Sequence, residues 1–484
     1  MTNPMNVRVA APLAVLLLAG CTPQPPEQQF IDDAMRAVGG RDRVIAVKSI
    51  VIEGTGVNYN LGQDMKPEAA TQQFAITGYK REVDTAQGKQ RVEQIRTPKF
   101  AYFQGPQPQT QIQVLDGDIA FNVGANGAAT RLGTAAERDR RTELFHHPIT
   151  ALIASTVPLT TVTNVRTVGN LRQADFAFRD RAWTMTIDAA GLPLSISSKT
   201  YHPNLGDVVV TTTFADYQDV NGVKLPAKIT GKVDDFTTYE IQASKQTIDA
   251  PVANVSAPPE VMKPAAPAPP NVTAQPIGKG VWLLGGQSHH SVLVEFADHL
   301  MLIEAPQSEA RTLAVIAKAK ETVPNKPLTE LVTTHHHFDH TAGMRAAIAE
   351  GMTVITQAGN REWVENMARR PHTLQPDHLA KNAGRLDIVT VDDEREIKDQ
   401  TMTVMLYHVA GNPHSDTMLM AYIPRDRVLI EVDAYSVGSQ VNPYAANLLE
   451  NIQKRKLRVD HIVPLHGTNT LFSELVKIVG GTTK

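Results

Sequence analysis

The stretch LTELVTTHHHFDHTAGMRAAIAE, residues 328–350, gathers three histidines and a carboxylate that could bind metal around one short turn. Its first part, Leu328 to Thr334, has the apolar and β-branched pattern of a strand, and the Ala-rich part from Thr341 to Glu350 is typical of a helix. His335 and His337 are two residues apart, so an extended segment points both to the same side. Asp339 and His340 follow at the turn. The stretch predicts a strand–loop–helix junction that carries a metal-ligand cluster.

Three further candidate ligands each follow a predicted strand. His414 comes after the strand 403–409, Asp433 after the apolar strand 428–432, and His466 after the strand 461–465. In α/β folds the carboxyl ends of strands are where sites are assembled. Together with the first cluster they give the candidate ligands His335, His337, Asp339, His340, His414, Asp433 and His466.

Composition limits the classes of partner. The chain has 484 residues, which suits two to three domains, and its formal net charge is −3. The chain has no excess of basic residues and only 5% of its residues are aromatic, so no nucleic-acid partner is expected. The expected partner is a small-molecule substrate. The sequence leaves the oligomeric state open.

The N-terminus predicts export and a membrane anchor. Arg8 precedes the apolar run 9–19, which is too short to span a bilayer and is typical of a secretory signal. Leu18-Ala19-Gly20-Cys21 resembles the cleavage box of bacterial lipoproteins, which implies a signal peptide over 1–20 and lipidation of Cys21. Thr22 after this cysteine would permit sorting to the outer membrane, facing the periplasm. Cys21 is the only cysteine, so a metal site must use His, Asp and Glu.

The rest of the chain divides into two domains. A tether over 21–30 leads into a mostly antiparallel β domain over 31–250, with helical patterns at 31–47 and 134–154 and hairpin signals such as Asn221-Gly222. The pieces 38–40, 188–193 and 216–226 resemble the curved half-barrel of bacterial lipoprotein-carrier proteins. A Pro/Ala-rich linker over 251–276 favours extended geometry. Strand and helix signals alternate over 277–484, a pattern typical of an α/β layered fold.

Histidine is distributed unevenly between the two domains. Thirteen of the 16 histidines lie after residue 288. The chemistry is therefore expected in the C-terminal domain.

The ligand pattern resembles that of the metallo-β-lactamase superfamily. Residues 334–343 match the His-x-His-x-Asp-His motif, and His414, Asp433 and His466 match the later single-ligand motifs in order. The resemblance covers 277–484 and implies an αβ/βα fold. Two positions differ from the usual pattern: Ala342 stands where the family mostly has Gly, and Glu304 where many members have Asp.

The resemblance also implies roles. His335, His337 and His414 would bind a first metal, Asp339, His340 and His466 a second, and Asp433 would bridge them. Two divalent metals are expected, with Zn²⁺ as the default and Fe or Mn suited to the same donors. A hydroxide held between the two cations would attack the substrate, and Asp339 would handle a proton.

Other residues have weaker claims. Glu304 could orient a ligand histidine, and His372 and Tyr435 could contact substrate. His289 and His290 could line the pocket. His336, between two ligands, is expected to point away.

The expected function is hydrolysis of an ester, lactone or amide, a β-lactam included. Asp433 stands where cysteine-using β-lactamases carry a thiolate, which leaves lactonases, esterases, amidases and all-His/Asp β-lactamases. Two alternatives stay open: an iron-dependent oxidoreductase on the same fold, or a non-catalytic lipoprotein that binds an envelope lipid or partner.

Overall fold

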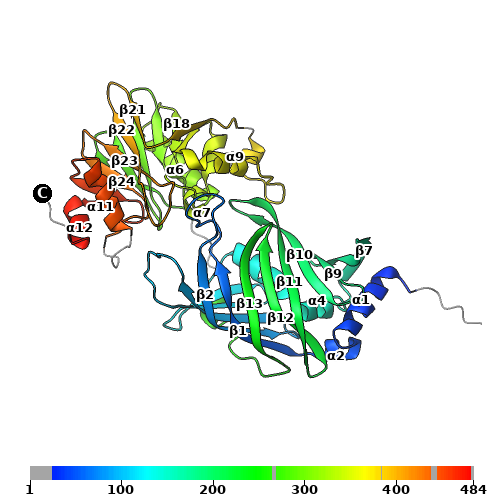
Figure 1. Ribbon diagram of the computed structural model, residues 1–484. Helices are drawn as coiled ribbons and strands as arrows, with labels where there is room; N and C mark the ends of the chain where they lie inside the picture. The colour runs from blue at the N-terminus through cyan, green and yellow to red at the C-terminus, as the bar shows by residue number, and fades with distance from the viewer. Residues whose placement is uncertain (1–23, 264–268, 383, 438–443, 481–484) are drawn as a thin grey trace, which may run out of the picture.

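The computed structural model describes residues 24–263, 269–382, 384–437 and 444–480. It has two parts, a single large antiparallel sheet from the N-terminal half and a two-sheet unit with outer helices from the C-terminal half (Figure 1). The two-domain architecture and the αβ/βα class of the C-terminal domain are as predicted. Cys21 and the predicted signal peptide lie outside the described residues.

The N-terminal domain is a 13-stranded antiparallel sheet in the order β6-β5-β4-β3-β2-β1-β13-β12-β11-β10-β9-β8-β7. Most neighbours in this order are joined by hairpins, and β1 and β13 bring the two ends of the domain together. The strands are β1 Ser49–Tyr59, β2 Gln73–Asp84, β3 Lys89–Pro98, β4 Gln109–Asp116, β5 Ile119–Val123, β6 Ala129–Arg131, β7 Thr160–Val168, β8 Leu171–Phe178, β9 Arg181–Ile187, β10 Pro193–His202, β11 Gly206–Val220, β12 Val223–Val233 and β13 Phe236–Ile248.

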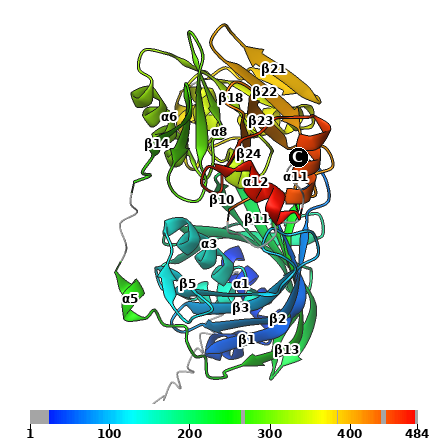
Figure 2. The same cartoon turned by 90° about the vertical axis from the view of Figure 1, so that its left-hand side faces the viewer.

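The sheet curves around its helices (Figure 2). These are α1 Pro26–Ala37, α2 Arg41–Ala46, α3 Thr134–Phe145 and α4 Pro148–Ala154. Apolar residues of α1 and α4, such as Phe30 and Leu152, are fully buried in one cluster with the inner face of the strands. Trp183 stacks between Phe145 and Phe176 in this core. Burial of this face is what holds the helices inside the curve.

The predicted helix over 134–154 is two helices. The break falls at His146 and His147, because Pro148 has no N–H to continue a hydrogen-bond ladder and fits best in a first turn. His147 Nδ1 accepts the N–H of Ile149 at 3.3 Å and caps α4. The pattern at 31–47 is likewise split, at Gly39-Gly40, where both residues have positive φ.

The segment expected to be an open linker is partly packed. It contains the short helix α5 Pro259–Met262, whose Val261 is buried against Val114 and Phe121 of the β domain. Strand β14 Thr273–Gly278 pairs with β15 Val281–Gly285, so the C-terminal sheet begins at residue 273 rather than 277. The proline content predicted a linker, but the strand over residues 273–275 forms because a partner strand lies beside it, which composition does not indicate.

Two sheets make the C-terminal domain. The first has the order β14-β15-β16-β17-β18-β19-β20 and the second β21-β22-β23-β24-β25-β26. Their strands are β15 Val281–Gly285, β16 Ser291–Glu295, β17 Leu300–Ile303, β18 Leu328–Val332, β19 Thr353–Gln357, β20 Ile388–Val391, β21 Glu394–Lys398, β22 Thr403–His408, β23 Leu419–Ile423, β24 Val428–Glu431, β25 His461–Pro464 and β26 Thr470–Leu471.

Alternation along the strands separates two cores in this domain. Val292 and Val294 of β16 face the second sheet, while Leu293 between them faces the helices on the first sheet's outer side. The helices of the domain are α6 Glu309–Thr322, α7 Phe338–Thr341, α8 Met344–Ala349, η1 Ala358–Asn360, α9 Arg361–Arg369, α10 His378–Lys381, α11 Ala445–Lys454 and α12 Phe472–Ile478. Helices α11 and α12 cover the second sheet with a further apolar cluster.

The helix predicted over 341–350 is also divided, into α7 and α8. Gly343 lies between them, where a Cβ would meet the Thr312 side chain at 1.8 Å. Ala342, the departure from the family pattern, has φ −61° and ψ −17° and so fits without strain.

No helix among the described residues is both long and apolar enough to cross a bilayer.

Candidate metal centre

The three histidines after β18 enter the site in an extended loop. His335 and His337 are fully buried, and one ring nitrogen of each is already committed to the protein. His335 Nδ1 lies 3.0 Å from Thr334 Oγ1, and His337 Nε2 donates to the carbonyl of Asp64 at 2.8 Å. The opposite nitrogen of each ring is left for a ligand. His337 Nδ1 is buried and has no hydrogen-bond partner among the described residues.

His414 completes a first group. It lies in the loop after β22, where the Asn412 side chain accepts its backbone N–H at 2.8 Å. Each of His335, His337, His414 and Asp433 offers one ligand atom, and these atoms lie within 4.8 Å of one another. Three imidazoles and one carboxylate in this space match the donor set of a zinc site.

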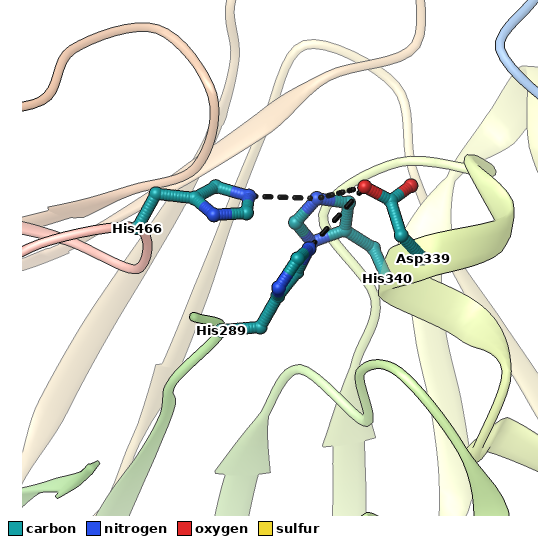
Figure 3. Close-up of side chains that lie close together, drawn as sticks. All are labelled: His289, Asp339, His340 and His466. Carbon is teal, nitrogen blue, oxygen red and sulfur yellow. Dashed lines mark hydrogen bonds and ion pairs between the residues drawn. The ribbon is translucent and has the colours of Figure 1, made fainter. Parts of the chain in front are cut away.

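Figure 3 shows a second group of four side chains that lie close together. It consists of His289, Asp339, His340 and His466, again with one ligand atom each within 4.8 Å. The Nε2 atoms of His340 and His466 face each other at 3.2 Å, while His466 Nδ1 donates to the Ser288 carbonyl at 3.1 Å. His289 Nε2 lies 3.3 Å from Asp339 Oδ2.

Asp433 touches both groups. Its Oδ2 lies 2.9 Å from His414 Nε2 and 3.4 Å from His335 Nε2, and its Oδ1 lies 2.6 Å from His466 Nε2. Its backbone has φ +60°, in the left-handed region. The buried carboxylate of Glu431 accepts the N–H groups of Ala434 and Tyr435 and so holds this turn. The sequence places Asp433 after a strand, but only this turn aims it between the groups.

Glu304 hydrogen-bonds both to the loop after β18 and to a ligand histidine. It is fully buried, its Oε1 accepts the N–H of Thr334 at 2.7 Å, and its Oε2 accepts from His340 Nδ1 at 2.8 Å. The bond fixes the ring so that His340 Nε2 faces the second group. The longer Glu side chain therefore reaches the ligand histidine at this position.

The electrostatics of the cluster favour a cation. Burial, followed by the neighbouring His337 and His340, lowers the pKa of His335 to about 3, so its imidazole stays neutral and keeps a lone pair. Burial also lowers the pKa of His337 well below its usual value. For Asp433, burial opposes the charge, but His340 and His466 hold the pKa well below the usual range. Neutral imidazoles with an ionised carboxylate are the forms that bind metal. At His340 burial is outweighed by Asp433 and Asp339, which raise its pKa well above the usual value, so a metal would displace a proton from this ring.

The N-terminal domain reaches this site, which was not predicted. Gln63, in the loop between β1 and β2, donates from Nε2 to Asp339 Oδ1 at 2.7 Å, and the carbonyl of Asp64 holds His337. In Figure 1 this loop rises from β1 and β2 to α7. No spacing in the sequence signals contacts between residues more than 270 positions apart.

Two predicted substrate residues lie elsewhere. His372 is buried in the contact between the domains, with its ring on Tyr201 and its Nδ1 3.2 Å from Asp377 Oδ2. Tyr435 is buried in the core beneath α11. A loop that contacts substrate was expected at His372, whereas for Tyr435 a packed side chain was the default expectation. His336 belongs to neither ligand group; its ring lies beside Thr417 and Trp363 and contacts the ring of His337 at 4.9 Å.

Two residues at the site were underestimated or missed. His289 was expected only as a pocket residue, yet it joins the second ligand group. Tyr444 packs its ring 4.9 Å from that of His414, and its hydroxyl donates to the Ala101 carbonyl of the β domain at 2.7 Å. His289 follows β15 without any ligand spacing, and Tyr444 lies in no motif, so neither gave a signal.

Part of the chain matches a known protein family. Residues 284–434 match the family model of the metallo-beta-lactamase superfamily. Similar solved structures include the metallo-beta-lactamase from Pontibacter korlensis, with 18% identity over 43% of this chain and 98% of that chain and a TM-score of 0.34. Another is FIM-1 from Pseudomonas aeruginosa in the mono-zinc form, with 19% identity, 43% and 92% coverage and a TM-score of 0.34.

A third similar structure has a different described activity. It is the rubredoxin oxygen:oxidoreductase of Desulfovibrio gigas, with 16% identity, 43% and 59% coverage and a TM-score of 0.34. The fold and the family match define the class of the C-terminal half as a metal-binding αβ/βα domain. That domain belongs to the metallo-β-lactamase superfamily.

The donors present fit the metals that the family implies. His337 Nδ1 has no hydrogen-bond partner in the described chain, and His340 and His466 each turn Nε2 inward because Nδ1 is bonded to the protein. Without a cation this would crowd lone pairs and buried polar atoms together at a cost in stability.

Proposed function

We propose that this chain is a dinuclear metal-dependent hydrolase that cleaves an ester, lactone or amide bond, β-lactams included. The observation that carries the proposal is Asp433, whose two oxygens reach histidines of both ligand groups. A carboxylate between two such groups is the arrangement of a two-metal site. The C-terminal domain is a metal-binding domain of the superfamily. We propose the type of bond that is cleaved, the class of substrate and the presence of two metals.

Two zinc ions, bound there, would supply Lewis acidity and an activated water at neutral pH. The chain's residues would hold them in two sets. His335, His337 and His414 would hold the first, and Asp339, His340 and His466 the second, with Asp433 between and His289 beside the second. Iron and manganese suit the same donors, so zinc is proposed for its preference for imidazole with carboxylate.

Asp339 is the proposed proton acceptor. Its side chain is 41% exposed, more than that of His289 at 13% or of His340 at 1%, so its carboxylate can meet water that enters the site. Burial opposes its charge, but His340 and the hydrogen bond from His289 hold the pKa of Asp339 far below its usual range. Asp339 is therefore a carboxylate at neutral pH and can accept a proton.

Metal analysis followed by a hydrolysis screen tests this function. We expect two zinc equivalents per chain and turnover of at least one class among lactones, β-lactams and aryl esters. His337→Ala and Asp433→Ala should each lower kcat/KM at least 100-fold, because each removes a ligand. His336→Gln, in the same run but in neither ligand group, serves as the control and should stay within about threefold.

Two results would contradict the proposal. A chain without stoichiometric metal would remove its basis. A chain that holds iron and consumes O₂ would be the oxidoreductase instead.

We further propose that the enzyme is anchored in the cell envelope through a lipid on Cys21. The support is the sequence of the first 21 residues. Metabolic labelling with a fatty acid should mark the wild type and not a Cys21→Ala variant.

A further inference from the structure

The loop between β1 and β2, residues 60–72, makes four consecutive contacts with the metal-ligand loops. Gly62 O accepts the N–H of Phe338 at 3.1 Å, Gln63 Nε2 donates to Asp339, Asp64 O accepts from His337, and Met65 O accepts the N–H of Asp416 at 2.6 Å. Their partners lie in the His-x-His-x-Asp-His motif or two residues beyond His414. Packing between two domains does not require hydrogen bonds to two ligand residues, so these contacts point to a role at the site.

Each of the two ligand contacts belongs to a different ligand group. His337 is in the first group and Asp339 in the second. Since the Asp64 carbonyl can only accept, His337 Nε2 carries the proton and Nδ1 keeps its lone pair for a metal. The Gln63 amide presents its Nε2–H₂ to Asp339 Oδ1 at 2.7 Å, which leaves Oδ2 directed to His289 and His340.

We propose that the β1–β2 loop of the N-terminal domain is part of the metal centre, with Gln63 positioning Asp339 for the second metal and the Asp64 carbonyl positioning His337 for the first. The inference rests on the proposed two-metal site. It gives the β domain a role in the chemistry of a centre that the C-terminal domain alone provides with ligands. Gln63 acts through Asp339, so it is a positioning residue and not a catalytic one.

Two glycines of the β1–β2 hairpin allow the role of the loop to be tested. Gly62 has φ +79°, and a Cβ there would lie 2.2 Å from the Phe338 ring, close to its attachment to the backbone. Gly62→Ala must therefore push the loop away from the ligands. Gly78, in β2 of the same hairpin, has φ +65°, but a Cβ there meets only Ile95 at an ordinary 3.5 Å. Gly78→Ala thus carries a similar backbone penalty without displacing the loop.

The experiment measures zinc affinity of the full chain by competition with a chromophoric chelator, together with the melting temperature. Gln63→Ala should weaken one of the two zinc equivalents by about 10–100-fold and leave the other within threefold. Gln63→Met, which keeps the length without the donor, should do the same. Gly62→Ala should weaken both equivalents, and Gly78→Ala neither. Lys66→Ala, an exposed residue of the same loop, is the side-chain control.

The outcomes separate this inference from the proposed function. Wild-type affinity for both zincs in Gln63→Ala overturns the role of Gln63, whatever the hydrolysis screen finds. Loss in Gln63→Ala but not in Gln63→Met overturns it too, because packing would then be the cause. A chain that binds two zincs, shows the selective loss and hydrolyses nothing would contradict the proposed function and leave this inference standing. Fewer than two zincs in the wild type contradicts both.

Discussion

At the scale of the residue, one ring nitrogen of each of three ligand histidines is hydrogen-bonded to the protein, and the other nitrogen is left for a metal. Glu304 takes His340 Nδ1, the Ser288 carbonyl takes His466 Nδ1, and the Asp64 carbonyl takes His337 Nε2. An imidazole held in this way has one tautomer and one direction for its lone pair. The sequence names the histidines, but the choice of nitrogen depends on acceptors that lie far away along the chain.

Glu304→Gln tests this principle. The amide would keep the bond from Thr334 but present N–H to His340 Nδ1, which would drive the ring proton to Nε2, the atom that faces the second group. We expect a loss of about 10–100-fold in affinity for one zinc and a fall in kcat, measured by chelator competition and steady-state kinetics.

Glu295→Gln is the matched control for this variant. Glu295 pairs with Lys326 on the same sheet and is partly exposed, so its loss costs at most about 1 kcal/mol. Equal zinc affinity in Glu304→Gln and the wild type would show that the carboxylate does not set the tautomer.

At the scale of the element, the sequence predicted most strands near the site and erred where helices break. Val428 to Val432 and His461 to Leu465 appear as β24 and β25, because unbroken apolar runs have few alternatives to a buried strand. The helix predicted over 134–154 is divided at His146 and His147, which lie buried within the curved sheet. Periodicity alone cannot show that these two histidines face a core.

Those two histidines predict acid sensitivity of the β domain. Burial lowers the pKa of His146 and of His147 from 6.5 to about 3. Between pH 6.5 and 3 the unfolded chain binds protons that the folded chain does not, so stability falls as the pH drops below 6.5. At pH 5 each histidine should cost about 2 kcal/mol of unfolding free energy.

His147→Asn tests this, because Asn can keep the cap on α4 without titrating. Urea unfolding of the metal-free protein at pH 7.5 and pH 5 should show a smaller acid-induced loss in the variant than in the wild type, by about 2 kcal/mol. The same loss in both proteins would mean that His147 is already protonated in the folded state.

At the scale of the whole molecule, the two domains meet at the metal centre and along the turn between β10 and β11. Leu205 and Val208 of the β domain are buried in the core cluster of the C-terminal domain. Asp207 accepts the N–H groups of Thr373 and Leu374, and its own N–H donates to the Pro371 carbonyl at 2.8 Å. This contact holds the β domain where its β1–β2 loop can reach the ligands.

Gly206→Ala should loosen that contact. Gly206 has φ +67°, and a Cβ there would lie 2.2 Å from the Pro371 carbonyl oxygen and against the His372 ring. Beyond a backbone penalty of about 1 kcal/mol, we expect a further cost of about 1–3 kcal/mol from overpacking and a roughly tenfold fall in kcat/KM. Calorimetry and steady-state kinetics would measure the two effects.

Gly222→Ala provides the comparison. It has φ +82° and open space around the added Cβ, so only the backbone penalty applies. If both variants lose activity equally, the contact at Gly206 does not hold the centre together.

The sequence by itself determined the family resemblance, the αβ/βα class, the two-domain division and the seven candidate ligands, because ligand spacing and strand periodicity are local properties. Only the tertiary structure decided that His289 joins the second group, that His372 lies buried between the domains, and that Gln63 and Asp64 of the β domain hold two ligands. The physical reason is that a hydrogen bond needs its partner within about 3 Å in space, and nothing in the local sequence records which distant loop the fold brings there.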